Sequence, residues 1–233
     1  MQTLHKPWHR KISLTAGVLY LLTFVSIPTL ALYGNAKDAA FITGTGSAAP
    51  VLIGALLEVI VALAGIGTAV VLFGILKKQN QLLSVGLIAS RTVEAAGILA
   101  GVACMLALVA LRDKGVGPEY AAIGNMLATL YHQIFLVSQS LMPAFNDLIL
   151  GYLLYKSGLV PQSLAKIGII GGPILFIGFL AVILGLAEQN GTIAGLSALP
   201  VAVFELVLGL WLVFKGFNPA AAEALKTRDH DSD

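Results

Sequence analysis

The stretch SRTVEAAGILAG, Ser90 to Gly101, places a charged pair inside a long apolar segment of this 233-residue chain. Arg91 and Glu94 are spaced i and i+3, so in a helix their side chains share one face. A charge inside a lipid bilayer costs at least a few kcal/mol and almost always faces protein or water. We therefore expect a membrane helix whose charged face points into the protein.

The composition of the whole chain supports this interpretation. Hydrophobic residues make up 58% of the sequence and charged residues 11%, with a mean hydropathy of +0.90. Soluble domains contain roughly 25% charged residues, and a soluble fold needs polar groups to cover its surface. Several apolar runs reach the roughly 20 residues that cross a bilayer as a helix, and the alternating strands of a membrane β-barrel are not seen. The predicted fold class is all-α, a polytopic bundle of transmembrane helices.

The apolar runs divide the chain into about six spans, within one transmembrane domain over residues 1–217. The predicted spans are residues 12–33, 50–76, 82–111, 134–155, 164–186 and 193–214. Pro28 should kink the first span. Its apolar part is longer than the 7–15 residues of a signal peptide, which favours a retained anchor. Residues 218–233 form a charged tail, which we expect to be disordered at its end.

The segment from Tyr120 to Tyr155 is too long for one crossing and short for two. Pro143 divides it, and its first half is unusually polar, with His132 and Gln139 among its side chains. We expect residues 121–132 to form an interfacial or re-entrant helix before the fourth span. A seven-span arrangement is the alternative.

The basic residues indicate the orientation of six spans. Most Lys and Arg residues fall at the ends that would share a side with the termini, whereas Lys37, Arg112 and Lys114 fall on the other side. The positive-inside rule then places both termini in the cytoplasm. We expect the inner membrane of a bacterium; seven spans would leave one terminus outside.

Three segments resemble a known family. They are LGYLLYKSGLVPQSLAKIGIIGG at 150–172, FELVLGLWLVFKGF at 204–217, and the Arg-x-x-Glu-Ala element in SRTVEAA. In these segments the chain is similar to an uncharacterised bacterial membrane family, the domain of unknown function 4386. Pro161-Gln162 stands where the family usually has Pro-Arg, so no role of that Arg can be carried over. The resemblance covers nearly the whole chain and implies a bundle of about six helices, without implying an activity.

Polar residues at similar depths are the main chemical signal. With a helical rise of 1.5 Å per residue, Arg91, Glu94, Asp147 and Glu205 fall about 13 to 20 Å from the inner helix ends. We predict that Arg91 pairs with Asp147 or Glu205 across helices. Three ionised carboxylates and one guanidinium would leave an excess of negative charge, so a proton or another cation is expected there. The secondary candidates are Glu58, nearer the outer interface, and His132, Gln139 and Asn146.

These residues leave several functional classes open. The cluster could only fix helix packing, in a non-catalytic scaffold, sensor or accessory subunit, or it could serve small-solute or ion-coupled transport. An enzyme is less expected because no catalytic, cofactor or metal motif occurs; His132 stands alone as a possible metal ligand. The expected partners are the lipid bilayer and a small-molecule or ion ligand. The net charge of +2 is no sign of nucleic-acid binding, and the oligomeric state is open. A transporter needs a cavity that reaches the cluster, whereas a scaffold should seal it.

Overall fold

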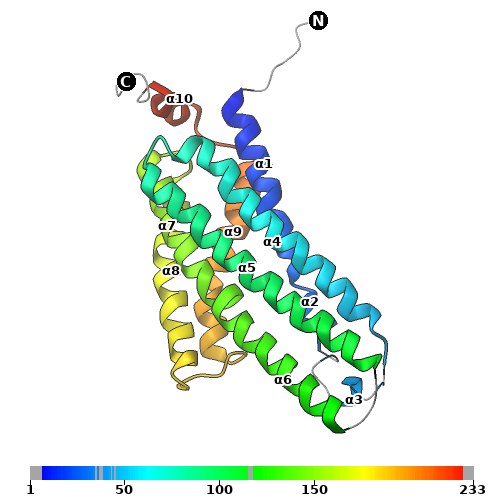
Figure 1. Cartoon of the computed structure of the whole chain (residues 1–233). Helices are drawn as coiled ribbons and strands as arrows, with labels where there is room; N and C mark the ends of the chain where they lie inside the picture. The colour runs from blue at the N-terminus through cyan, green and yellow to red at the C-terminus, as the bar shows by residue number, and fades with distance from the viewer. Residues whose placement is uncertain are drawn as a thin grey trace, which may run out of the picture.

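The protein, as a computed structural model, is a bundle of long helices (Figure 1). The structure describes residues 7–34, 36, 39–42, 44, 46–114 and 118–227. The elements in these ranges are α1 (Trp8–Thr23), η1 (Phe24–Ser26), α2 (Thr29–Leu32), α3 (Ala39–Ile42), α4 (Ala49–Leu76), α5 (Gln81–Arg112), α6 (Pro118–Phe135), η3 (Leu136–Leu141), α7 (Met142–Ser157), α8 (Gln162–Ile183), α9 (Thr192–Phe214) and α10 (Pro219–Thr227). The expected all-helical class is confirmed.

Five helical segments of the described chain are long and apolar enough to cross a membrane. They are α4, α5, the continuous segment Glu119–Ser157, α8 and α9. The segment from α1 through η1 to α2 runs alongside them (Figure 1), although its helices are individually short. The protein is therefore a multi-pass membrane protein with a number of spans consistent with six.

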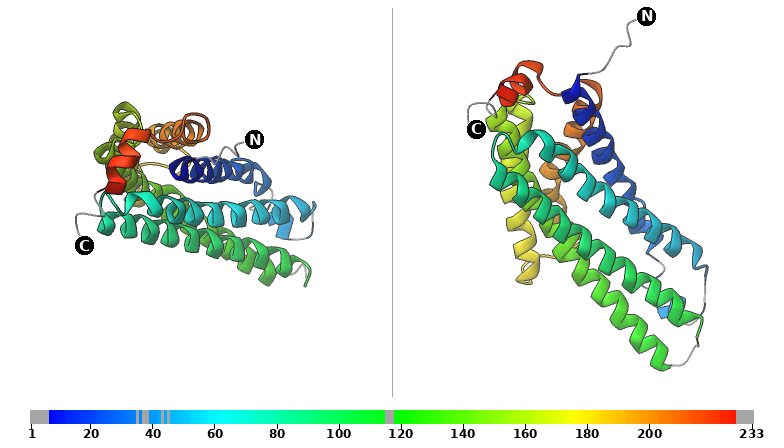
Figure 2. Two further views of the ribbon diagram at one scale, coloured as in Figure 1. Left: turned by 90° about the horizontal axis from the view of Figure 1, so that it is seen from above. Right: turned by 45° about the horizontal axis from the view of Figure 1, so that its top comes forward.

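Six of these elements close into a ring. Each packs against the next in the order α1, α4, α5, α7, α8 and α9, and α9 packs back against α1. The view from above in Figure 2 shows α1 between α4 and α9. Helix α6 lies outside this ring and packs on α5 and α3. Because α5 and α9 lie across the ring from each other, a long side chain is needed to connect them.

The first span breaks near the expected kink. Helix α1 ends at Thr23, a 3-10 turn covers Phe24–Ser26, and Pro28 precedes the short helix α2. Proline has no backbone N–H and its ring clashes with the preceding turn, so it does not continue a regular helix. The first span is thus not one regular helix.

The interpretation of residues 121–132 as a separate interfacial or re-entrant helix needs correction. Helix α6 continues through the π-helical segment η3 into α7, so Glu119–Ser157 is one unreversed helix of 39 residues. This continuity also rules out the two crossings of the seven-span alternative. At 1.5 Å per residue it is about 59 Å long, well beyond a bilayer core of about 30 Å. The π turn also accommodates Pro143, which stands at the start of α7.

Glycines let the backbones of neighbouring helices approach closely. A Cβ built on Gly151 of α7 would lie 2.8 Å from the backbone nitrogen of Ile169 on α8. A Cβ on Gly97 of α5 would collide with Ser138 of η3, and one on Gly101 would meet the ring of Tyr131 at 3.3 Å. The small-residue face of α5 therefore packs against α6 and η3, as small residues do in membrane bundles.

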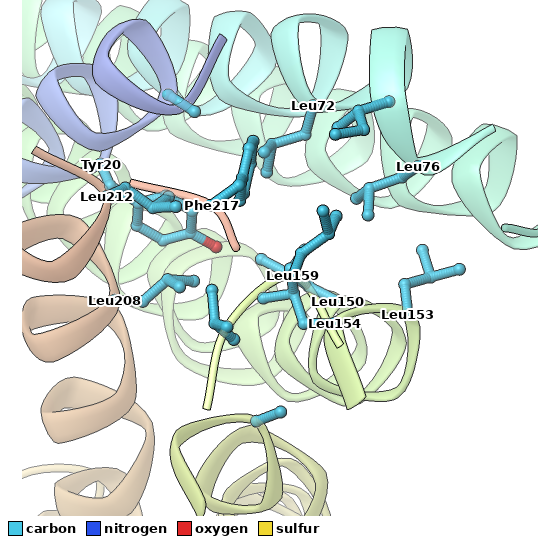
Figure 3. Packing of buried hydrophobic residues seen from close by; sticks show 14 of the residues in the cluster. Tyr20, Leu72, Leu76, Leu150, Leu153, Leu154, Leu159, Leu208, Leu212 and Phe217 are labelled. Atoms are coloured by element: carbon cyan, nitrogen blue, oxygen red, sulfur yellow. The ribbon is translucent and has the colours of Figure 1, made fainter. Parts of the chain in front are cut away.

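The largest group of buried apolar side chains lies at the end of the ring where α1 begins. Figure 3 shows Leu72, Leu150 and Leu208 among the side chains that meet there from three helices. Helix α10, in the segment expected to be a charged tail, adds the buried Ala222 and Leu225 to this cluster. Residues 228–233, the end expected to be disordered, lie outside the described residues.

Candidate functional site

Arg91 lies within α5 and reaches across the ring. Its Nη1 donates to Oε2 of Glu94 at 3.0 Å, and its Nη2 donates to Oε1 of Glu205 on α9 at 2.8 Å. The same Nη2 donates to the hydroxyl of Tyr20 on α1 at 3.0 Å and lies 3.9 Å from Oδ1 of Asp147 on α7. Arg91 is only 4% exposed. One guanidinium thus joins α1, α5, α7 and α9.

Two neighbouring residues of α7 complete this Arg91 cluster, which we define as Arg91, Glu94, Asp147, Glu205, Tyr20 and Asn146. Nδ2 of Asn146 donates to Oε2 of Glu94 at 2.7 Å. Asp147 is fully buried, and neither of its carboxylate oxygens accepts a hydrogen bond from the described residues. Buried polar atoms usually have a hydrogen-bond partner, so Asp147 is the least satisfied member of the cluster.

The charges of the Arg91 cluster do not balance. Three carboxylates lie within 4 Å of the guanidinium nitrogens, at 3.0, 2.8 and 3.9 Å. In a low-dielectric interior, like charges that outnumber their counter-charge are strongly disfavoured. The arrangement therefore favours the gain of a positive charge, from a proton or from a cation.

A cavity of about 230 Å³ reaches this cluster. Arg91, Glu94 and Glu205 form part of its wall, and Gln139 of η3 adds a further polar group. The rest of the lining is mainly apolar or small. These residues are Thr23, Phe24, Ser26, Ile27, Val61, Ala62, Gly65, Ala95, Ile98, Pro143 and Ala202.

The cavity reaches the surface of the bundle between η1 and α9. Ile27 is 62% exposed and Ala202 is exposed, and both residues line the cavity. Glu94 and Glu205 retain side-chain exposures of 11% and 16%, whereas the side chain of Asp147 has none. A solute in the cavity would therefore meet Glu94 and Glu205 first, with Asp147 behind them.

Irregular helical segments border this cavity on two sides. The break of the first span at η1 supplies Phe24 and Ser26, and the π-helical segment supplies Gln139. Mid-helix 3-10 and π turns often occur at hinges and functional sites. Within a membrane, irregular backbone is tolerated where it is buried in protein or lines a cavity.

A second polar cluster surrounds Glu58 of α4. Its Oε1 accepts a hydrogen bond from the hydroxyl of Tyr131 at 2.9 Å and from Nε2 of Gln139 at 3.4 Å. Its Oε2 accepts one from the hydroxyl of Tyr33 at 3.3 Å. Glu58 is fully buried within the protein. Gln139 belongs to both sites, because it also lines the cavity.

His132 neighbours Tyr131 of the Glu58 cluster and is not among the residues that line the cavity. Its ring packs edge-on against Tyr131, with centroids 6.1 Å apart, and its backbone oxygen accepts a hydrogen bond from Gln189. Within the described residues, no three His, Cys, Asp or Glu side chains are grouped so as to hold a metal ion.

Sequence reasoning missed the tyrosines. Tyr20 contacts Arg91 through its hydroxyl, and the Arg91 guanidinium carbon lies 5.4 Å from its ring centroid. Aromatic residues in membrane proteins concentrate at the interfaces, and Tyr20 stands mid-span instead. Its position away from the interfaces was the one sign in the sequence that Tyr20 has a polar partner inside the bundle. Tyr33 and Tyr131 gave none, because both fall near predicted helix ends.

Comparisons with known proteins place the chain in a family. No curated protein and no solved structure matches it. One family model matches residues 15–216, a range that includes every residue of the Arg91 cluster and Glu58. The protein belongs to the family described as domain of unknown function (DUF4386).

Proposed function

We propose that this protein transports a small solute across the membrane in an ion-coupled cycle, with the cavity at the Arg91 cluster as the binding site. The observation that carries the proposal is the cavity of about 230 Å³ whose wall contains Arg91, Glu94 and Glu205. Charged groups within membrane helices usually mark substrate or ion sites. A cluster that served packing alone would be best stabilised without a cavity beside it, because empty space loses contacts.

The backbone around the cavity supports the same proposal. Transporters bind their substrates near the bilayer midplane, at discontinuous helices. Here the discontinuity at η1 and the π turn at η3 both contribute to the cavity wall. Pro200 lies inside α9, close to Ala202 and Glu205 of the same wall. These positions are suited to open and close the cavity.

The alternative is a non-catalytic scaffold, sensor or accessory subunit. The hydrogen bonds of Arg91 to Tyr20 and Glu205 favour it to a degree, because they fix the register of three helices. The two functions differ in one respect: a scaffold does not need the cavity to admit a hydrophilic molecule.

We also propose that the end of the bundle where α1 begins faces the cytoplasm, in the inner membrane of a bacterium. Lys11, Lys77, Lys156 and Lys215 lie at or near helix termini at this end (Figure 1). An excess of basic residues on one side is typical of cytoplasmic loops.

Thiol labelling in proteoliposomes tests the transport proposal. The single cysteine, Cys104, is buried and is first replaced, giving Cys104→Ala. In this background, Ala202→Cys puts a thiol in the cavity wall, and Val203→Cys puts one on the exposed apolar side of α9. The reagent is a trimethylammonium methanethiosulfonate, which does not cross the bilayer, applied from each side in turn.

We expect labelling of Ala202→Cys from both sides and little labelling of Val203→Cys. The reason is that a thiol in lipid stays protonated and the thiolate is the reactive form. Equal, slow labelling of the two variants would mean that the cavity is closed to water, and would refute transport in favour of the scaffold.

A further inference from the structure

We infer that the ligand of this cavity is a small monovalent organic cation, an ammonium group with a short apolar tail, held by Glu205 and Glu94. This inference rests on the proposed function, because it names the substrate class of the same site. It is carried by four features: the sign of the charge, the engagement of Arg91, the carboxylate of Asp147 and the character of the wall.

The sign of the charge comes from the carboxylates. Glu94, Asp147 and Glu205 all lie within 4 Å of one guanidinium, at 3.0, 3.9 and 2.8 Å. A bound cation would reduce the excess negative charge, and a bound anion would increase it. Buried charges are stable when they are paired and hydrogen-bonded, so the cluster selects for a positively charged ligand.

Arg91 is already hydrogen-bonded within the cluster, so its guanidinium is not available to bind an anion. Its Nη1 donates to Glu94, and its Nη2 is shared by Glu205 and Tyr20. An anion would have to displace one of these carboxylates and leave it unpaired in the protein interior. That exchange is unfavourable because an unpaired buried charge is costly.

Asp147 supplies a second place for the guanidinium. It is fully buried, its carboxylate oxygens accept no hydrogen bond from the described residues, and Oδ1 lies 3.9 Å from Nη2 of Arg91. A shift of Arg91 by about 1 Å would bring this pair to normal hydrogen-bond distance and release Glu205 to the cavity. An ammonium group that binds Glu205 therefore leaves both Arg91 and Asp147 paired.

The rest of the wall suits an apolar tail. Phe24, Ile27, Val61 and Ile98 line the cavity beside the charged groups. A volume of about 230 Å³ equals that of about eight water molecules at roughly 30 Å³ each. The space is larger than a proton or a bare metal ion requires, and it matches an alkyl chain of a few carbons.

Binding of three matched probes to the full-length protein in nanodiscs tests the inference. The probes are n-butylammonium, butyrate and 1-butanol, which have four carbons each and differ in charge. We expect saturable binding of butylammonium, at least tenfold tighter than that of the other two, by calorimetric titration. Lengthening the ammonium chain should tighten binding by about fourfold per methylene until the cavity is full.

Two variants locate the site, and a third controls for surface charge. Glu205→Gln should weaken butylammonium binding at least tenfold, whereas Glu188→Gln, the same change at an exposed position, should leave it unchanged. If Glu205→Gln does not fold, Ala202→Phe fills the cavity without changing its charge and should abolish binding of the ammonium.

The remaining outcomes overturn the inference. Tighter binding of butyrate would mean that Arg91 selects an anion. Equal binding of all three probes would mean that the site does not distinguish ligands by their charge. If the ammonium does not bind at any pH, the remaining ligand would be a proton. Failure of the proposed function can be distinguished from failure of this inference. Ammonium binding without labelling of Ala202→Cys would refute transport but support the cation site. Labelling without ammonium binding would support transport but refute the cation site.

Discussion

Replacing Arg91 by Gln should destabilise the protein by about 3–5 kcal/mol. The side chain is 4% exposed and donates to Glu94, Tyr20 and Glu205 at 3.0, 3.0 and 2.8 Å. Removing one partner of a buried ion pair costs about that much, because the remaining charges are left uncompensated. The measurement is the free energy of unfolding of the purified protein in mixed micelles, titrated with a denaturing detergent.

The double variant Arg91→Gln with Glu205→Gln measures the interaction energy between these two side chains. Because the two side chains are in direct contact, we expect the combined loss to be smaller than the sum of the single losses by about 0.5–3 kcal/mol. Lys166→Gln is the matched control, since Lys166 is exposed, and it should change the free energy by less than about 0.5 kcal/mol. A loss below about 1 kcal/mol for Arg91→Gln, or strict additivity with Glu205→Gln, would refute the account of Arg91 as the buried hub.

Two further predictions follow from distances in the bundle. Arg91→Glu should be rescued better by Glu205→Arg than by Asp147→Arg, as judged by folded yield. The reason is that Arg91 lies 2.8 Å from Glu205 and 3.9 Å from Asp147. Equal failure of both exchanges would argue against pairing across the ring. Gly172→Ala should destabilise the protein by about 1–3 kcal/mol, because its Cβ would lie 2.5 Å from a backbone oxygen of α7, whereas Gly195→Ala meets open space and should not destabilise. A thermal unfolding series compares the two, and equal midpoints would contradict the packing of α7 on α8.

The sequence predicted the helical class and the four charged members of the Arg91 cluster, but not Tyr20 or the choice between partners. Helical rise alone places Arg91, Asp147 and Glu205 at similar depths. Which carboxylate contacts the guanidinium depends on the rotation of α5 and α9 about their axes, and rotation is set by packing across the ring. The hydroxyl of Tyr20, which shares Nη2 of Arg91, enters for the same reason.

The cavity and the Glu58 cluster could not be predicted, because both depend on irregular backbone. The π turn at η3 changes which residues face inward, and it brings Gln139 to Glu58 and to the cavity together. No residue pattern marks a π turn inside a long helix. Pro28 signalled a kink in the first span, but the resulting opening between η1 and α9 follows from how far the neighbouring helices separate.

Uptake of a permanently charged probe tests the central claim, passage of a small cation through this cavity, most directly. Alkylguanidinium ions remain protonated at all accessible pH, so radiolabelled n-propylguanidinium does not leak across the bilayer as a neutral amine would. We predict saturable uptake into proteoliposomes containing the wild-type protein, reduced at least tenfold by Glu205→Gln and unchanged by Glu188→Gln. Wild-type uptake equal to that of protein-free vesicles would contradict the account.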